Sequence, residues 1–320
     1  MKEIGGYFGL GDLVDQPFYK ELVALNSGSN ALLYLIKARH MTKIHIPWYL
    51  CDSVSDLITK SGCQFDYYSV DEQFQPIFDQ QLGAGEYVYV VNLYGQITDE
   101  KIKALKTRYP QLIMDHSQAF FQRPLEGVDT IYSCRKYFGL PDGAYLATDV
   151  QLTESLEQDQ SKDRMAHVLG RSESSASDYY AEFRDSNDKL SHVPLRTMSK
   201  VTSHLMGAVD TDRAIQKRNE NYARLHELLE TENPLKLTTP TGPFAYPLLV
   251  ENGMIIRKKL AEQNIYIPLL WPNVLEDCPQ DSIEYHYALN ILPLPCDQRY
   301  NKEDMDYLVN MLKSQVVYKE

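Results

Sequence analysis

The segment Leu112-Ile-Met-Asp115-His-Ser-Gln118 places an acidic residue directly after a short apolar run. Such a run, bounded by polar residues, is typical of a buried strand in a parallel sheet. A carboxylate at a buried strand end is costly unless a cationic or hydrogen-bond-donating group meets it. Position alone therefore leaves two interpretations of Asp115 open: a satisfied turn or cap, and a carboxylate that faces a cation in a site.

The segments around Asp115 predict a sheet covered by helices. Short apolar runs alternate with stretches of helical spacing and are joined by short connections, which favours an α/β fold with a mostly parallel sheet and helices on both faces. In such sheets ligands collect at the carboxyl ends of the strands, so we expect Asn92, Asp115 and Ser133 to lie at a ligand-binding edge. The predicted strands are 43–46, 64–70, 87–92, 112–114, 129–133 and 144–148, and the predicted helices are 30–38, 51–60 and 98–109.

The second half of the chain has a different pattern. Residues 151–190 are polar and helix-prone, and the spacing predicts a long helix over 195–229. We expect a domain boundary near residue 235, which divides a large domain (1–235) from a smaller C-terminal α+β domain (236–320). In the smaller domain the patterns predict strands at 245–250, 265–270 and 287–292, and a closing helix at 301–313.

Composition narrows the classes of function. The chain has 320 residues, 43% hydrophobic content and a formal charge of −12, which suits a globular protein that does not bind nucleic acid. The five cysteines form no Cys-x-x-Cys pair, and no histidine cluster has metal-ligand spacing, so no metal site is expected. With no apolar leader and no run of about 20 apolar residues, we expect a cytoplasmic protein without a membrane span.

Lys136 lies in the segment Tyr132-Ser-Cys-Arg-Lys-Tyr-Phe-Gly139, after a predicted strand and before a glycine-containing turn. Most lysines are solvated surface residues. Here an apolar, aromatic setting and the neighbouring Arg135 would both favour the neutral amine, as required of a lysine that condenses with an aldehyde. Ser133, three residues earlier, is a further candidate donor to a phosphate.

The segment Ser27-Gly28-Ser29-Asn30 precedes a predicted helix. Free backbone N–H groups and the helix dipole make such a position suitable for a phosphate, and Ser29 and Asn30 would add side-chain donors. The alternative, and the commoner one for an isolated Ser/Asn cluster, is an ordinary helix cap.

Taken together, these motifs resemble the DegT-like nucleotide-sugar aminotransferases. They match the family's motifs in the right order through most of the chain. The matching segments are the phosphate loop 27–32, the Pro-plus-aromatic segment 46–49, Asn92-Leu-Tyr-Gly-Gln96, Asp115-His-Ser-Gln-Ala119, the lysine segment 133–146 and Ile291-Leu-Pro-Leu-Pro295.

The resemblance implies a fold-type I transferase dependent on pyridoxal 5′-phosphate, normally a homodimer with active sites at the interface. Members move an amino group, usually from glutamate, to a keto sugar on a nucleotide carrier, often for surface polysaccharides. In this chain Lys136 would hold the cofactor covalently and Asp115 would face its ring nitrogen. The other residues expected at the cofactor are Gly28, Ser29, Asn30, Tyr49, Gln118 and Ser133.

Several departures keep other functions open. Asp115 and Lys136 are 21 positions apart, which is a shorter interval than is usual for the family. Cys51 stands where members often have a ring-stacking aromatic residue. The alternatives are other cofactor-dependent sugar chemistry such as dehydration, against which Lys136 argues, and a non-catalytic regulator or scaffold. The polar stretch 151–229, with Arg171, Arg184 and Arg196, is the expected region of contact with a second subunit.

Overall fold

The computed structural model describes residue 7, residues 9–10 and residues 13–315. Within this part of the chain, one eight-stranded sheet has the strand order β1-β8-β7-β6-β5-β2-β3-β4. The pairs β3–β2, β2–β5, β5–β6 and β6–β7 are parallel, whereas β8 runs antiparallel to β7 and β1. The strands are β1 Val23–Leu25, β2 Lys43–Pro47, β3 Gln64–Val70, β4 Pro76–Ile77, β5 Glu86–Val91, β6 Leu112–Asp115, β7 Asp129–Ser133 and β8 Ala144–Ala147.

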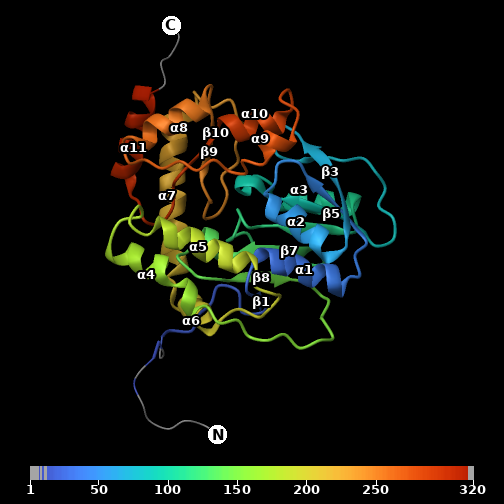
Figure 1. Ribbon diagram of the computed structural model, residues 1–320. Coiled ribbons are helices and arrows are strands. Elements are labelled where there is room, and N and C mark those ends of the chain that lie inside the picture. Colours follow the sequence, from blue (N-terminus) through green and yellow to red (C-terminus); the bar gives the residue numbers. More distant parts are fainter. Residues whose placement is uncertain (1–6, 8, 11–12, 316–320) are drawn as a thin grey trace.

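Helices connect and cover these strands. α1 begins after the Ser27 cap, and Figure 1 shows α1 and α2 lying across the sheet. Leu32 and Leu35 of α1 are buried against the sheet in the largest apolar core. The predicted alternation of strands and helices in this half is confirmed. The helices are α1 Gly28–Ala38, α2 Asp52–Ser61 and α3 Asp99–Arg108, with short turns η1 Leu93–Gly95 and η2 Cys134–Lys136.

The middle of the chain is helical but interrupted. The single long helix predicted over 195–229 is wrong: residues 195–199 are not helical, and α6 ends before Val209. Asp210 then accepts a hydrogen bond from the Arg213 N–H and begins α7 as a new cap. The elements here are η3 Lys162–Arg164, α4 Ala166–Glu173, α5 Tyr180–Ser191, α6 Lys200–Ala208 and α7 Thr211–Leu229.

A small two-stranded sheet, β9 paired antiparallel with β10, follows α7. Side chains from α7, β9, β10, α8 and α11 form a second apolar core. Figure 1 shows these elements grouped at its upper left. Trp271, Tyr287 and Ile291 instead pack against the first core. The division at residue 235 stays a prediction. The elements are β9 Tyr246–Leu249, α8 Gly253–Ala261, α9 Val274–Asp277, α10 Ile283–Asn290, β10 Ile291–Leu294 and α11 Lys302–Gln315.

Two predicted strands of this region are wrong. Residues 265–270 form no strand, because Pro268 lacks an N–H for a ladder and Trp271 follows with φ of 56°. Residues 287–290 belong to α10, which Ser282 caps by accepting a hydrogen bond from the Tyr285 N–H. Only the end of that apolar run, from Ile291, pairs as a strand.

Candidate functional site

The carboxyl ends of β5, β6 and β7 meet at one edge of the sheet. Val91 lies opposite Asp115, and Asp115 lies opposite Ile131, so the three strands end close together. The Asn92 N–H donates to the Asp115 carbonyl at 2.9 Å. The expected placement of Asn92, Asp115 and Ser133 at strand ends is therefore confirmed, and this edge is where a parallel sheet binds ligands.

Asp115 is buried and held by donors on both carboxylate oxygens. The Tyr89 hydroxyl donates to Oδ2 at 2.8 Å, and the Ser117 N–H donates to Oδ1 at 2.7 Å. Burial, followed by the nearby Asp115 charge, raises the pKa of Tyr89 well above its usual value, so its hydroxyl keeps its proton and donates. These contacts fix the orientation of the carboxylate at the strand edge.

Lys136 ends the short turn η2 that follows β7. Its Nζ donates to the Ser117 Oγ at 3.0 Å, so the amine lies beside the turn that carries Asp115. Cys134 and Tyr137 are buried, but Lys136 itself is exposed, which corrects the expectation of a desolvated lysine. The turn directs its neighbours into the core and leaves Lys136 facing open space.

Arg135, the residue before Lys136, has hydrogen-bond acceptors of its own in the chain. Arg135 Nη2 donates to Asn187 Oδ1 at 2.6 Å, and its Nε donates to the Leu140 carbonyl at 3.3 Å. Burial lowers the pKa of Arg135 to about 10. Both acceptors are neutral, and the effect of Arg135 on the lysine stays a prediction.

The start of α1 lies against β7. The Ser27 hydroxyl accepts from the Asn30 N–H at 3.1 Å, while a side chain at Gly28 would come within 3.9 Å of Ile131 Cγ2. The N–H groups of Gly28 and Ser29 lie in the first turn, which has no intrahelical acceptor for them. The hydroxyls of Ser29 and Ser133 form no hydrogen bond within the described residues. These donors are available to an anion at the same sheet edge.

The Asn30 amide has a different use. Its Nδ2 is within hydrogen-bond distance of Asn26 Oδ1 (2.9 Å) and of the carbonyls of Val193 and Pro194 (both 3.1 Å). Asn30 is buried, and these bonds fasten α1 to the segment before α6. Its side chain therefore has acceptors inside the chain, which argues against its predicted part in binding a phosphate.

Gln118 and Tyr49 also have partners in the chain. Gln118 Oε1 accepts from the Tyr94 N–H at 2.8 Å, which leaves its amide nitrogen without a hydrogen bond among the described residues. Tyr49 is 1% exposed, with its ring edge-on to Trp271 at 4.7 Å. This packing leaves no open ring face, so it speaks against Tyr49 as a cofactor-stacking residue. Trp48, the other aromatic residue of the segment 46–49, is stacked on Tyr67 with the ring centres 3.8 Å apart.

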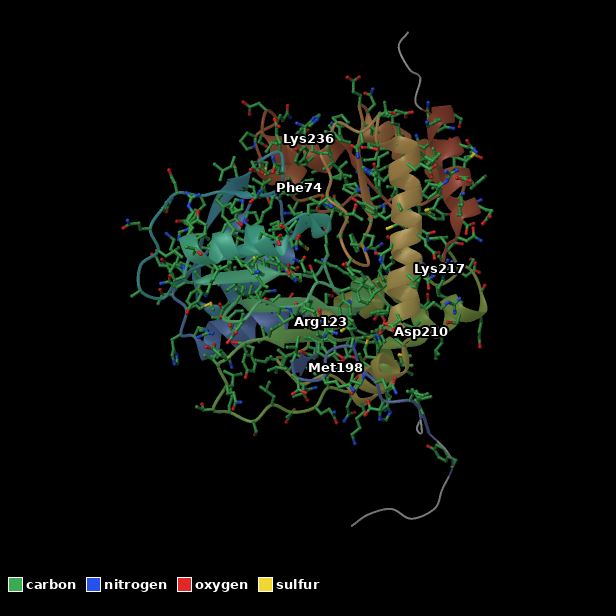
Figure 2. The ribbon with its side chains drawn as sticks, turned by 180° about the vertical axis from the view of Figure 1, so that it is seen from behind. Phe74, Arg123, Met198, Asp210, Lys217 and Lys236 are labelled. Carbon is green, nitrogen blue, oxygen red and sulfur yellow. The ribbon has the colours of Figure 1, made fainter. Side chains whose placement is uncertain are left out.

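A cavity of about 1040 Å³ opens beside Lys136. One wall is the loop 135–140, and the others come from α4, α5, the junction of α6 with α7, and residues 297–299. Figure 2 shows Asp210, one of the lining residues, at the lower end of α7. Charged side chains on the walls comprise six cations, Arg135, Lys136, Arg171, Arg213, Arg218 and Arg299, and two acids, Asp210 and Asp297.

The cavity walls carry more cations than acids, although the formal net charge of the whole chain is −12. Arg299 pairs with Asp297 at 2.7 Å, but Arg171 and Arg213 are exposed and form no ion pair within the described residues. Of the other arginines expected to reach a neighbour, Arg196 pairs with Glu157 at 3.1 Å, and Arg184 does not line the cavity. The cavity is therefore suited to an anionic ligand that extends away from Lys136.

Ser117 and Tyr89 were missed from the sequence. Ser117 stood inside the segment that identified Asp115, yet its contact with Lys136 depends on how the two turns meet in space. Tyr89 had a weak signal: a tyrosine in a buried strand needs a hydrogen-bond partner for its hydroxyl. The parallel register of β5 and β6 supplies that partner. In the described part of the chain, no group of three or more potential metal ligands occurs.

No protein-family model and no curated sequence matches the chain. Solved structures do match it over most of its length. A DegT/DnrJ/EryC1/StrS aminotransferase from Brucella abortus aligns with a TM-score of 0.63 and 15% identity, over 92% of this chain and 86% of that one. The aminotransferase PseC of Helicobacter pylori, involved in pseudoaminic acid biosynthesis, aligns with a TM-score of 0.63 and 13% identity, over 92% and 86% of the two chains.

A third structure was solved with a bound cofactor. NtdA from Bacillus subtilis, with bound PMP, aligns with a TM-score of 0.62 and 15% identity, over 92% of this chain and 74% of that one. These likenesses establish the fold: the chain has the α/β architecture of fold-type I transferases, and the expected fold class is confirmed. The resemblance to DegT-like proteins drawn from the motifs is confirmed at the level of the fold.

Proposed function

We propose that this protein is a sugar aminotransferase dependent on pyridoxal 5′-phosphate. The observation that carries the proposal is the path of contacts from Asp115 through Ser117 to Lys136 at the ligand-binding edge of the sheet. A carboxylate and a primary amine held together at this edge are the two side chains that this cofactor's chemistry needs. The fold supports the proposal, since neighbours include an aminotransferase and a protein solved with PMP.

The residues at the sheet edge fit this cofactor in three places. The first turn of α1, with Ser29, offers donors to a phosphate, and Ser133 lies at the end of the adjoining strand. Lys136 offers an amine to an aldehyde, and Asp115 is placed to hold a proton on a ring nitrogen. Bound pyridoxal phosphate supplies an aldehyde carbon and an electron-withdrawing ring. As a free amine, Lys136 would serve as the base that moves a proton at the substrate carbon.

The cavity beside Lys136 supports an anionic substrate. We propose a keto sugar on a nucleotide carrier, whose phosphates would meet Arg171 and Arg213 on the cavity walls. Tyr179 and Tyr180 also line the cavity and offer aromatic surface to a base. Glutamate as the amino donor follows from the family resemblance.

Two further parts of the proposal concern the cell and the assembly. All five cysteines are free thiols, in keeping with a reducing compartment, and we propose the cytoplasm. Among the described helices, none combines the length and the apolar character needed to span a bilayer.

We also propose a homodimer, in which the exposed lysine and the open cavity face a second subunit.

The half-reaction with an amino donor tests the proposal. Purified protein incubated with pyridoxal phosphate should turn yellow, and borohydride should fix the cofactor to Lys136. Glutamate should then convert the bound cofactor to its pyridoxamine form. Lys136→Ala should abolish the borohydride-fixed adduct, while Lys103→Ala, which removes an exposed lysine of α3, should leave it intact.

The same experiment separates the alternatives. Cofactor attachment without conversion by any amino donor would favour other sugar chemistry, such as dehydration. Protein that binds no cofactor would favour a regulator or scaffold, the alternative that the short Asp115–Lys136 interval keeps open. A covalent adduct that persists in Lys136→Ala would refute the assignment of the lysine.

A further inference from the structure

Ser117 contacts both of the side chains on which the proposed function rests. Its backbone N–H donates to Asp115 Oδ1 at 2.7 Å, and its Oγ accepts from Lys136 Nζ at 3.0 Å. Ser117 is 6% exposed, so both contacts are fixed by a buried turn. We propose that Ser117 is a positioning residue, whose hydroxyl holds the Lys136 amine beside Asp115 and ready for an aldehyde. This inference rests on the proposed function.

Lys136 needs such a partner because little else restrains it. Its side chain is exposed, and a flexible four-carbon stem loses considerable rotamer freedom when it is held in one place. The Ser117 hydroxyl is its hydrogen-bond partner among the described residues. No acidic group forms an ion pair with Lys136 in that part of the chain. The direction in which the amine points is therefore set by the Ser117 hydroxyl.

A hydroxyl suits this task better than a carboxylate. It accepts an N–H from either the charged or the neutral amine, and it carries no charge that would favour the ammonium. With one N–H directed at Ser117, the nitrogen lone pair of the neutral amine is free to form a bond to the aldehyde carbon. Both amine hydrogens then pass to the departing oxygen, and water is released.

The two contacts of Ser117 can be separated by mutation. Ser117→Ala removes the hydroxyl and its contact with Lys136 but keeps the backbone N–H that binds Asp115. Tyr89 remains as the second donor to that carboxylate. The variant therefore changes the hold on the amine and leaves the hold on Asp115 in place. Ser117→Thr restores a hydroxyl at the same position.

The test compares covalent attachment with non-covalent binding in the cofactor-free protein. The first measurement is the rate constant for borohydride-fixable attachment of pyridoxal phosphate. The second is the Kd for 4′-deoxypyridoxine phosphate, which lacks the aldehyde. Ser117→Ala should slow attachment about tenfold, the effect of one lost hydrogen bond, and leave the analogue's Kd unchanged. Ser117→Thr should restore the rate, and Ser314→Ala, which removes an exposed hydroxyl of α11 outside the cavity, should change neither value.

Each other outcome overturns the inference in a distinct way. An unchanged attachment rate in Ser117→Ala would show that the hydroxyl does not position the amine. An equal loss of attachment rate and analogue affinity would assign Ser117 to cofactor contact or to folding instead. Failure of the unmodified protein to attach pyridoxal phosphate would overturn the proposed function, and this inference with it.

Discussion

The Asp115 carboxylate receives one hydrogen bond on each oxygen, from Tyr89 and Ser117, and both donors are neutral. Its negative charge is therefore available to stabilise a proton on a bound ring nitrogen. We expect Asp115→Asn, which keeps the shape and removes the charge, to slow the glutamate half-reaction by about a hundredfold. Single-turnover absorbance measures this rate.

A matched control exists on the neighbouring strand. Asp129 is also buried but lies at the opposite end of β7, where it pairs with Arg39 at 2.9 Å. Asp129→Asn should reduce stability and leave the half-reaction rate of the folded protein unchanged. An undiminished rate in Asp115→Asn would contradict the role of this residue.

His116, next to Asp115, makes folding sensitive to acid. It is 1% exposed, and burial lowers its pKa to about 4. Between that value and the unfolded value of about 6.5, the unfolded chain binds a proton that the folded chain does not. Stability is therefore fully present above pH 6.5 and falls as the pH drops.

Urea unfolding at pH 7.5 and pH 5 tests this effect. We expect the loss of unfolding free energy between the two pH values to be about 2 kcal/mol smaller in His116→Phe than in the unmodified protein. The other histidines contribute equally to the loss in both proteins, so their contribution cancels in this comparison. Equal losses in the two proteins would show that His116 is not buried in its neutral form.

The predictions at the residue scale succeeded where the local pattern carried the information. Asp115 follows an apolar run, and Lys136 follows a strand, so both could be placed at a sheet edge from the sequence. The contact of Ser117 with Lys136 depends on how two turns meet in space, and that of Tyr89 with Asp115 depends on the register between β5 and β6. No local pattern specifies either. Tyr49 was placed at the ring because it neighbours a proline motif, but its side chain points into the core.

Among the helices, α7 carries a buried cation that joins three parts of the chain. The Arg218 side chain is 2% exposed, and its guanidinium lies 4.4 Å from the centre of the Tyr137 ring. It donates to Gln298 Oε1 at 2.7 Å, to the Pro243 carbonyl at 2.8 Å and to the Tyr137 carbonyl at 3.3 Å. Arg218 thus links Tyr137, the residue after Lys136, to Pro243 and Gln298, which lie before β9 and after β10.

We expect Arg218→Met to lower the free energy of unfolding by about 3 kcal/mol, because three buried acceptors lose a charged donor. Its neighbour Lys217, which Figure 2 shows on α7, pairs with Glu220 at 2.7 Å on the helix surface. Lys217→Met should change the unfolding free energy by less than about 0.5 kcal/mol. Urea unfolding measures both values, and similar losses in the two variants would contradict the anchoring role of Arg218.

Helices and strands were predicted best where the spacing of apolar residues matches only one of the two. The strands of the parallel sheet are short apolar runs between polar segments, and their places were correct. The run from residue 287 to 292 suits a helix and a strand equally, and the Ser282 cap determined the outcome. The break at Asp210 was missed because a capping residue inside a polar helix pattern looks like any other polar residue.

At the scale of the whole molecule, charge is unevenly distributed. The chain is strongly acidic, yet six cations and two acids line the cavity beside Lys136. Exposed apolar side chains gather at the same place: Leu169, Tyr180 and Phe183 are 58%, 59% and 42% exposed and all line this cavity. A cluster of large exposed apolar groups is typical of a surface that a protein partner or a ligand covers.

We propose a second copy of the chain as this partner, as the family resemblance implies. We expect light scattering at micromolar concentration to report a dimer, whose interface buries well over roughly 2,000 Å² in total, as obligate homodimers do. Replacing Leu169 and Tyr180 together by Glu should shift the protein towards a monomer, because two charges would have to be buried. Tyr266→Glu removes an equally exposed tyrosine (61%) outside the cavity and should leave the dimer intact. A monomer with cofactor bound would contradict this assembly, since the open cavity and the exposed lysine would then need no second subunit.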